Sequence, residues 1–207
     1  FHSLNLQFPP RDPRAKDVEV MGEKMDHLNK IVAQILDFAR SSEPNLAPVD
    51  LNELIDDLGL LTRHKLTNQG IELIRRLDPG RPLVLADATQ LEQAFLNLTL
   101  NAVEAMPAGG KLTVSTGMRR HPRKAGAPTH AVIEFKDTGH GMSEEQRSRM
   151  FSSLLSTTKA KGTGLGLAIV AKIVEAHQGK IEVKTSLGRG TSIALQIPLS
   201  ETKAGTK

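Results

Sequence analysis

The chain has 207 residues, of which 39% are hydrophobic and only 3% aromatic, and it carries a formal net charge of +4. It has no cysteine, which excludes disulfide frameworks, cysteine zinc sites and thiol nucleophiles. No apolar run reaches the roughly 18 to 20 residues of a membrane helix, and the basic residues form no aromatic-interleaved patch for nucleic acid. We therefore expect this portion to be soluble and cytoplasmic, with no nucleic-acid partner.

The first predicted element is a long helix over residues 15–41. Its apolar residues recur at alternating intervals of four and three, the a/d seam of a coiled coil; they are Met21, Met25, Leu28, Val32, Ile35 and Ala39. One helix cannot bury such a seam, so we expect a homodimer through this helix. The alternatives are the loss of a preceding helix, of which residues 1–8 would be the end, and packing of the helix on its own domain.

We expect four regions: a partial helical hairpin over 1–43, a linker over 44–49, a second domain over 50–199 and a disordered tail over 200–207. In the second domain the patterns predict helices over 50–70, 87–106 and 166–177. Strands are predicted over 71–77, 83–86, 111–118, 129–136, 181–185 and 191–198. Because helices and strands mix without strict β-α-β alternation, the expected class is α+β, a two-layer sandwich with a mixed sheet covered on one face by helices.

A nucleotide site is indicated by the stretch between residues 137 and 167. It begins with Asp-Thr-Gly-His-Gly-Met at 137–142 and ends with Gly-Thr-Gly-Leu-Gly-Leu at 162–167, where a helix starts. Glycines let backbone N–H groups approach a ligand, and a helix start attracts phosphate. The polar residues between the two motifs, which include Lys159, are expected to form a flexible cover.

Two amides on the predicted helix over 87–106 complete the pattern. Asn97 and Asn101 are four residues apart and share one face of the helix. An uncharged amide oxygen suits Mg²⁺ beside phosphates that already bring negative charge. Taken alone, the pair would be read as surface amides.

In this order the motifs resemble those of the GHKL ATPase superfamily and, within it, the two-component sensor histidine kinases. Residues 97–105 resemble the N box, 137–142 the first glycine box, Phe151 the F box and 162–167 the second glycine box. The resemblance implies a Bergerat-type sandwich preceded by a long helix of a dimeric helical bundle. It also implies that ATP and Mg²⁺ are the cofactors and that a response-regulator receiver domain is a partner. The intact protein would be membrane-anchored or linked to a sensor domain.

The resemblance also assigns roles to residues. Asp137 would accept the adenine amine with support from Thr191, Asn101 would hold Mg²⁺, and Asn97 and Lys159 would meet the phosphates. The full set implied to contact the nucleotide is Asn97, Asn101, Ala105, Asp137, Gly139, Gly141, Met142, Lys159, Gly162, Thr163, Gly164, Leu165, Gly166, Leu167 and Thr191. A carboxylate accepts from adenine's amine and finds no such donor at that position of guanine, so ATP is expected over GTP.

The residue at position 97 distinguishes ATP hydrolysis from transfer of the phosphoryl group to a protein side chain. Relatives that hydrolyse ATP usually carry a glutamate there as general base, and an asparagine cannot take a proton at neutral pH. We therefore expect transfer of the γ-phosphoryl group to a histidine, then to a response-regulator aspartate. The acceptor is expected upstream of this chain, with His2 as the candidate within it. The alternatives are a non-catalytic nucleotide-sensing or dimerisation module, and another ATPase or serine kinase of the superfamily.

Overall fold

The computed structural model describes residues 16–18, 20–22, 24–25, 43–119, 129–150 and 165–200. The predictions for residues 1–8, most of the helix over 15–41, the cover over 151–164 and the tail from 201 lie outside these residues. The described elements are β1 (Ala47–Asp50), α3 (Leu51–Asn68), β2 (Ile71–Arg76), β3 (Leu83–Ala86), α4 (Ala88–Ala105), β4 (Gly110–Arg119), β5 (His130–Asp137), α5 (Glu144–Arg149), α6 (Leu165–Ala176), β6 (Lys180–Thr185) and β7 (Thr191–Pro198).

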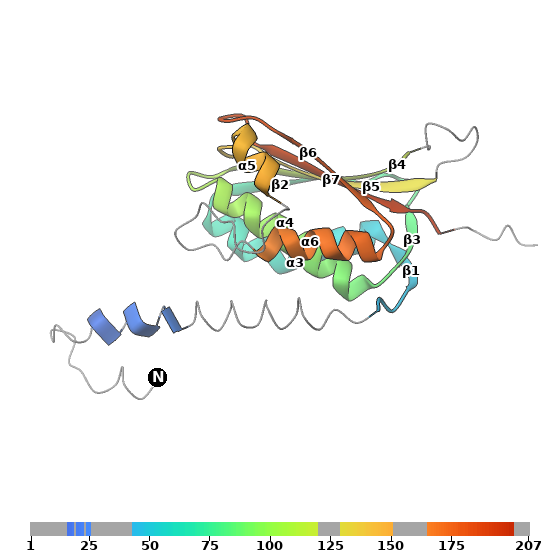
Figure 1. Ribbon diagram of the computed structural model, residues 1–207, viewed down its shortest axis with the longest axis horizontal. Coiled ribbons are helices and arrows are strands. Elements are labelled where there is room, and N and C mark those ends of the chain that lie inside the picture. The colour runs from blue at the N-terminus through green and yellow to red at the C-terminus, as the bar shows by residue number, and fades with distance from the viewer. Residues whose placement is uncertain are drawn as a thin grey trace, which may run out of the picture.

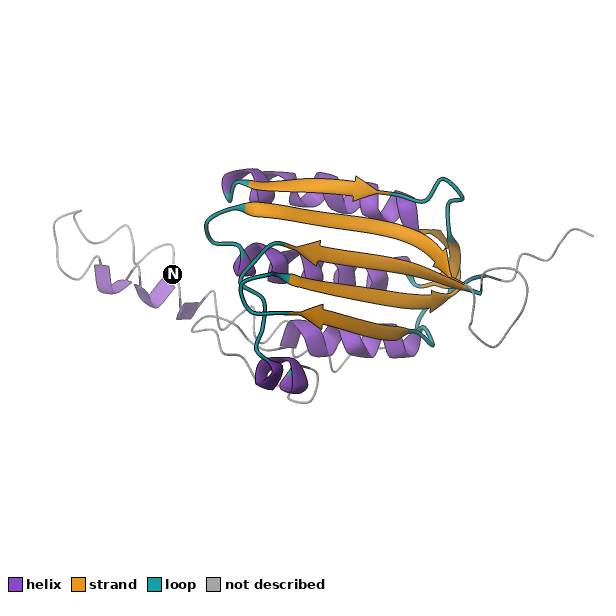
Figure 2. Ribbon diagram, turned by 90° about the horizontal axis from the view of Figure 1, so that it is seen from above, coloured by secondary structure: helices purple, strands orange, loops and turns teal. Residues whose placement is uncertain are grey.

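Five strands form one mixed sheet in the order β2-β4-β5-β7-β6. The β2–β4 pair is parallel, and the other neighbours are antiparallel. Helices α3, α4 and α6 lie side by side on one face of this sheet (Figures 1 and 2). The predicted two-layer arrangement, with a mixed sheet and helices on one face, is confirmed.

The hydrophobic core lies between these two layers and fixes α4 against β5. The Phe95 and Phe135 side chains are buried, with ring centroids 5.5 Å apart. On α4 the other buried apolar residues recur at helical spacing, and they are Leu91, Ala94, Leu98, Ala102 and Val103. Burial of each large apolar side chain contributes roughly 1.5–3 kcal/mol. The core therefore sets where the flank of α4 that carries the half-buried Asn97 and Asn101 lies relative to the end of β5.

The region predicted as a linker differs from the expectation at its end. Residues 47–49 were placed in the linker, but with Asp50 they form β1, which pairs antiparallel with β3. Proline is tolerated on an edge strand, and Val49 is buried opposite the buried Val84. The ordered domain thus begins before Asp50, and it also extends to Ser200, whose N–H donates to the Leu83 carbonyl at 3.0 Å.

Asp87 joins the incoming chain to the two helices that matter for the site. Its carboxylate caps α4 by accepting from the Gln90 N–H at 3.1 Å, and it also accepts from the Asn45 N–H at 3.0 Å. Its own N–H donates to the buried His177 ring at 2.9 Å, directly after α6. His177 thereby has a structural role as a hydrogen-bond acceptor between α4 and α6.

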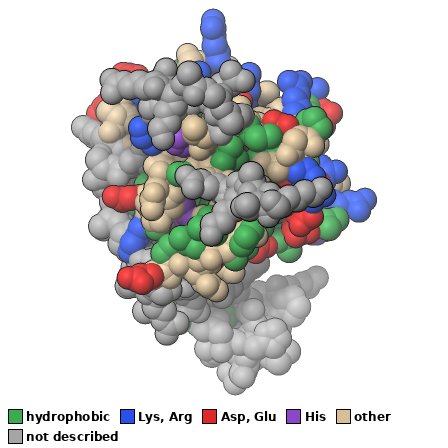
Figure 3. Space-filling model, turned by 90° about the vertical axis from the view of Figure 1, so that its right-hand side faces the viewer, with side chains coloured by type: hydrophobic (Ala, Val, Ile, Leu, Met, Phe, Trp, Pro, Cys, Tyr) green, Lys and Arg blue, Asp and Glu red, His purple; other side chains and the backbone are tan. Residues whose placement is uncertain are grey.

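The end of the domain at which β1 and β3 lie has a mixed surface. Leu46, Leu83 and Leu85 are 43%, 48% and 47% exposed there. Figure 3 shows hydrophobic side chains interspersed with acidic and basic ones on this side of the molecule. Among the described helices, none has the length and apolar character that crossing a membrane requires.

Candidate functional site

The carboxylate of Asp137 is buried at the end of β5. Its Oδ1 accepts two backbone N–H groups, from Gly139 at 2.8 Å and from Thr191 at 3.1 Å. Among the described residues nothing donates to its Oδ2. Burial raises the pKa of the Asp137 carboxyl, while the N–H groups of Gly139 and Thr191 act in the opposite direction. The side chain is therefore fixed by one oxygen and offers the other as a hydrogen-bond acceptor.

The glycines around Asp137 are required by close approaches of the backbone. A Cβ at Gly139 would lie 2.5 Å from the carbonyl oxygen of Ala105, and one at Gly141 only 2.1 Å from that of Ser186. At Gly190, which has a φ of +83°, an added Cβ would lie 2.1 Å from the carbonyl oxygen of Asp137 itself. The loop after β5 is thus packed between the end of α4 and the β6–β7 turn.

Thr185 is a further residue of this region that sequence reasoning missed. It lies opposite Thr191 in the β6–β7 register, and the two hydroxyl oxygens are 3.0 Å apart. The Thr185 hydroxyl also accepts from the Met142 N–H at 2.9 Å. The hairpin register could have indicated this pairing, because a turn of five residues joins the two predicted strands.

The two amides on α4 lie where α6 begins. A Cβ at Gly166 would lie 3.8 Å from Nδ2 of Asn101 and 3.9 Å from Oδ1 of Asn97. Both Nδ2 atoms are buried and have no hydrogen-bond partner among the described residues. An unpaired buried donor costs roughly 1–3 kcal/mol, so these amides are suited to an oxygen-rich ligand. The first turn of a helix carries N–H groups that have no partner within the helix and a positive dipole end, and the start of α6 brings both to the same place.

A single face of α4 connects the two halves of the site. Asn97, Asn101 and Ala105 follow one another at four-residue intervals, about 12 Å along the axis in total. The Ala105 carbonyl accepts the His140 N–H at 3.1 Å, so the loop after Asp137 rests on the last turn of α4. An elongated ligand can therefore lie along α4, with one end at Asp137 and the other under Gly166.

The donor set fits Mg²⁺ held together with phosphates. Among the described residues, no group of three or more His, Asp or Glu side chains could hold a metal by itself. Mg²⁺ typically takes only one or two protein ligands beside phosphate oxygens and water. The amide oxygen of Asn101, next to a phosphate-seeking helix start, matches that requirement.

The structure describes only some of the other predicted site residues. Leu165 begins α6 and Leu167 packs against the hydrophobic core. Lys159, Gly162, Thr163 and Gly164 lie outside the described residues, as do Phe151 and His2.

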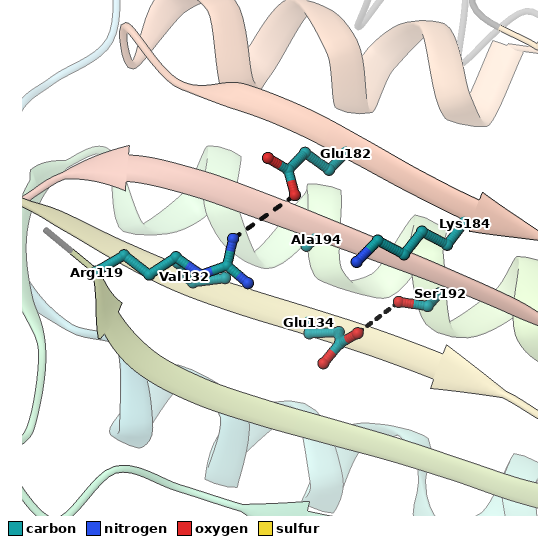
Figure 4. Close-up of a pocket in the computed structure, with 7 residues that line it drawn as sticks. All are labelled: Arg119, Val132, Glu134, Glu182, Lys184, Ser192 and Ala194. Atoms are coloured by element: carbon teal, nitrogen blue, oxygen red, sulfur yellow. Dashed lines mark hydrogen bonds and ion pairs between the residues drawn. The ribbon is translucent and has the colours of Figure 1, made fainter. Parts of the chain in front are cut away.

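A shallow pocket on the opposite face of the sheet is separate from this site (Figure 4). It is lined by Arg119, Val132, Glu134, Glu182, Lys184, Ser192 and Ala194. Arg119 and Glu182 form an ion pair at 3.7 Å with both side chains about half exposed. Such pairs contribute at most about 1 kcal/mol, and we assign this face no role in ligand binding.

Residues 86–201 match a family described as histidine kinase-, DNA gyrase B- and HSP90-like ATPases. The chain belongs to this family. It is 34% identical over 185 residues to the sensor histidine kinase ZraS of Escherichia coli strain K12, covering 89% of this chain and 38% of ZraS. The chain thus spans about two fifths of that relative's length.

Solved structures of histidine kinases share the fold. Full-length ShkA in complex with AMPPNP superposes with a TM-score of 0.74 at 29% identity, covering 93% of this chain and 40% of ShkA. Histidine kinase ThkA in complex with response regulator protein TrrA gives 0.75 at 25% identity, covering 95% and 54%. The resemblance to sensor histidine kinases stated from the motifs is confirmed.

The environment of Asp137 predicts opposite effects of Asp137→Asn on binding and on stability. Because the Gly139 and Thr191 N–H groups hold the side-chain oxygen, the new NH₂ group must replace Oδ2. A donor then faces the adenine amine, and ATP affinity should fall on the order of 100-fold. Isothermal titration measures this loss.

Thermal unfolding provides the control for this variant. A carboxyl whose folded pKa is raised favours folding only at low pH, and this contribution is lost as the pH rises through the folded pKa. At pH 7 the Asn variant should therefore be at least as stable as the wild type, and its advantage should disappear near pH 4. Unchanged ATP affinity would refute the role of Asp137.

Gly166→Ala tests the space above the two amides. The added methyl group makes only ordinary contacts with Asn97 and Asn101, so the domain should fold with unchanged or higher stability. Nucleotide affinity should nevertheless fall about ten-fold, because the methyl group would enter the space in which we expect the phosphates to bind. The matched control is Gly59→Ala on α3, where the methyl group would meet Leu73 and Arg75 instead. Equal affinities of the two variants would contradict the placement of the phosphates.

Proposed function

We propose that this chain is the ATP-binding core of a sensor histidine kinase. It binds ATP with adenine at Asp137 and the triphosphate at Asn97, Asn101 and the start of α6. The observation that carries the proposal is that, within the described part of the chain, Oδ2 of the buried Asp137 carboxylate and the Nδ2 atoms of Asn97 and Asn101 have no hydrogen-bond partner. Family membership and the AMPPNP bound by ShkA support ATP as the ligand.

The residues of the chain hold the nucleotide in the geometry for transfer. Asp137 fixes the base, and the backbone N–H groups at the start of α6 and the Asn97 amide bind phosphate oxygens. Asn101 would hold Mg²⁺ through its amide oxygen, and the metal would supply positive charge beside the phosphates. Positioning and charge neutralisation of this kind supply most of the catalysis in phosphoryl transfer.

The γ-phosphoryl group passes to a histidine imidazole. An imidazole nitrogen attacks the γ-phosphorus, the bond to the β–γ bridging oxygen breaks, and ADP leaves with the electron pair. Asn97 cannot act as the general base for water, which favours this acceptor over hydrolysis. Within this chain the candidate acceptor is His2, which lies outside the described residues.

A dimer and a receiver domain complete the proposed system. The described residues 20–22 and 24–25 are helical, and Met21 and Met25 of the heptad seam are 58% and 46% exposed. Pairing of this helix with a second copy would bury them. The complex of ThkA with TrrA supports a response regulator as the protein to which the phosphoryl group is relayed.

Phosphotransfer can be measured directly. The chain is incubated with γ-³²P-labelled ATP, Mg²⁺ and the histidine-bearing helical hairpin of a sensor kinase relative, and Asp137→Asn is the control. We expect an acid-labile, alkali-stable label on histidine, absent with the variant. Free phosphate without labelled protein would indicate an ATPase, and acid-stable label a serine kinase. Nucleotide binding without transfer would indicate a sensing module, and label on His2 would place the acceptor in this chain.

A further inference from the structure

Strand β6 is an edge strand beside β7 (Figure 1). Thr185 is its last residue and lies opposite Thr191 in the register. Its side chain is part-buried, on the face of the sheet that the helices cover. The hydroxyl oxygen makes three contacts: with the Met142 N–H at 2.9 Å, the Gly190 carbonyl at 3.2 Å and the Thr191 hydroxyl at 3.0 Å. The Thr185 hydroxyl therefore connects the loop after Asp137, the β6–β7 turn and Thr191.

The number of protons on each group determines which group donates in each of these hydrogen bonds. A threonine hydroxyl has one proton to donate and two lone pairs that accept. The Met142 N–H uses one lone pair of Thr185, and the Gly190 carbonyl can only accept, so it takes the Thr185 proton. All three contacts are then hydrogen bonds only if the Thr191 hydroxyl donates to the remaining lone pair of Thr185.

This direction changes what Thr191 can offer a ligand. Its proton is committed to Thr185, so its oxygen can only accept. The Thr191 N–H meanwhile donates to Oδ1 of Asp137, and Oδ2 is also an acceptor. Two acceptors suit an exocyclic amine, which has two protons to donate, and disfavour a carbonyl oxygen, which has none.

We propose that Thr185 is a positioning residue for base selection, which acts by accepting the Thr191 proton so that Thr191 and Asp137 both present acceptors to the base. The inference rests on the proposed function, because it concerns the adenine end of the same site. Thr185 does not touch the base, and its effect is on the choice between a 6-amino and a 6-oxo purine.

ATP and ITP form a suitable pair of probes, because inosine carries an oxygen in place of the adenine amine. Affinities of both nucleotides are measured by titration for the wild type, Thr185→Val, Thr185→Ala and Thr185→Ser. We expect the wild type to prefer ATP. The Val and Ala variants, which release the Thr191 proton, should lose about five- to ten-fold of that preference. The Ser variant keeps the hydroxyl and should keep the preference.

A double variant tests whether Thr185 acts on base selection through the Thr191 hydroxyl or only stabilises the site for both nucleotides. In a Thr191→Val background, Thr185→Ala should leave the ATP to ITP ratio unchanged, because the hydroxyl through which Thr185 acts is absent. Weaker binding of both nucleotides with an unchanged ratio in the single variants would overturn the inference while leaving the proposed function intact. A wild type that binds both nucleotides equally, or neither, would instead contradict the proposed function at Asp137.

Discussion

The proposed nucleotide site depends on the buried carboxylate of Asp137, to which the described residues donate hydrogen bonds at only one oxygen, Oδ1. Desolvation opposes the ionised form of Asp137, and two backbone donors to Oδ1 offset part of that cost. Those donors exist because glycines at 139 and 190 allow the backbone to close around the side chain. In the proposed binding mode the amine of an amino purine donates to Oδ2, the oxygen that the loop leaves available.

Helix α4 sets the distance between the two ends of the proposed site. Its buried face, centred on Phe95 against Phe135, holds it in place on the sheet. The half-buried flank beside it presents Ala105 to the loop after Asp137 and the two amides to the start of α6. The Asp87–His177 bond ties the start of α4 to the end of α6, and the Asn45 bond to Asp87 joins the incoming chain to both helices.

The sequence indicated the main parts of this site because each has a local signature. The spacing of Asn97 and Asn101, the strand that leads to Asp137 and the helix after the last glycines depend on neighbouring residues only, and their elements lie where periodicity predicted. The strand β1 was mistaken for linker because prolines mark loops, while its stability comes from pairing with β3, which follows more than thirty residues later. The roles of Thr185 and Gly190 depend on contacts with a loop more than forty residues earlier, which no local pattern encodes. Gly139 and Gly141 were predicted for ligand approach, and packing against Ala105 and Ser186 is a separate reason for them.

We propose that the base lies against Asp137 and that the phosphates lie between α4 and the start of α6. A crystal structure of the chain with AMPPNP and Mg²⁺ would show both positions. We expect the adenine amine within about 3 Å of Oδ2 of Asp137, with phosphate oxygens at the amides of Asn97 and Asn101. A purine bound anywhere else, or a triphosphate remote from Gly166, would contradict it.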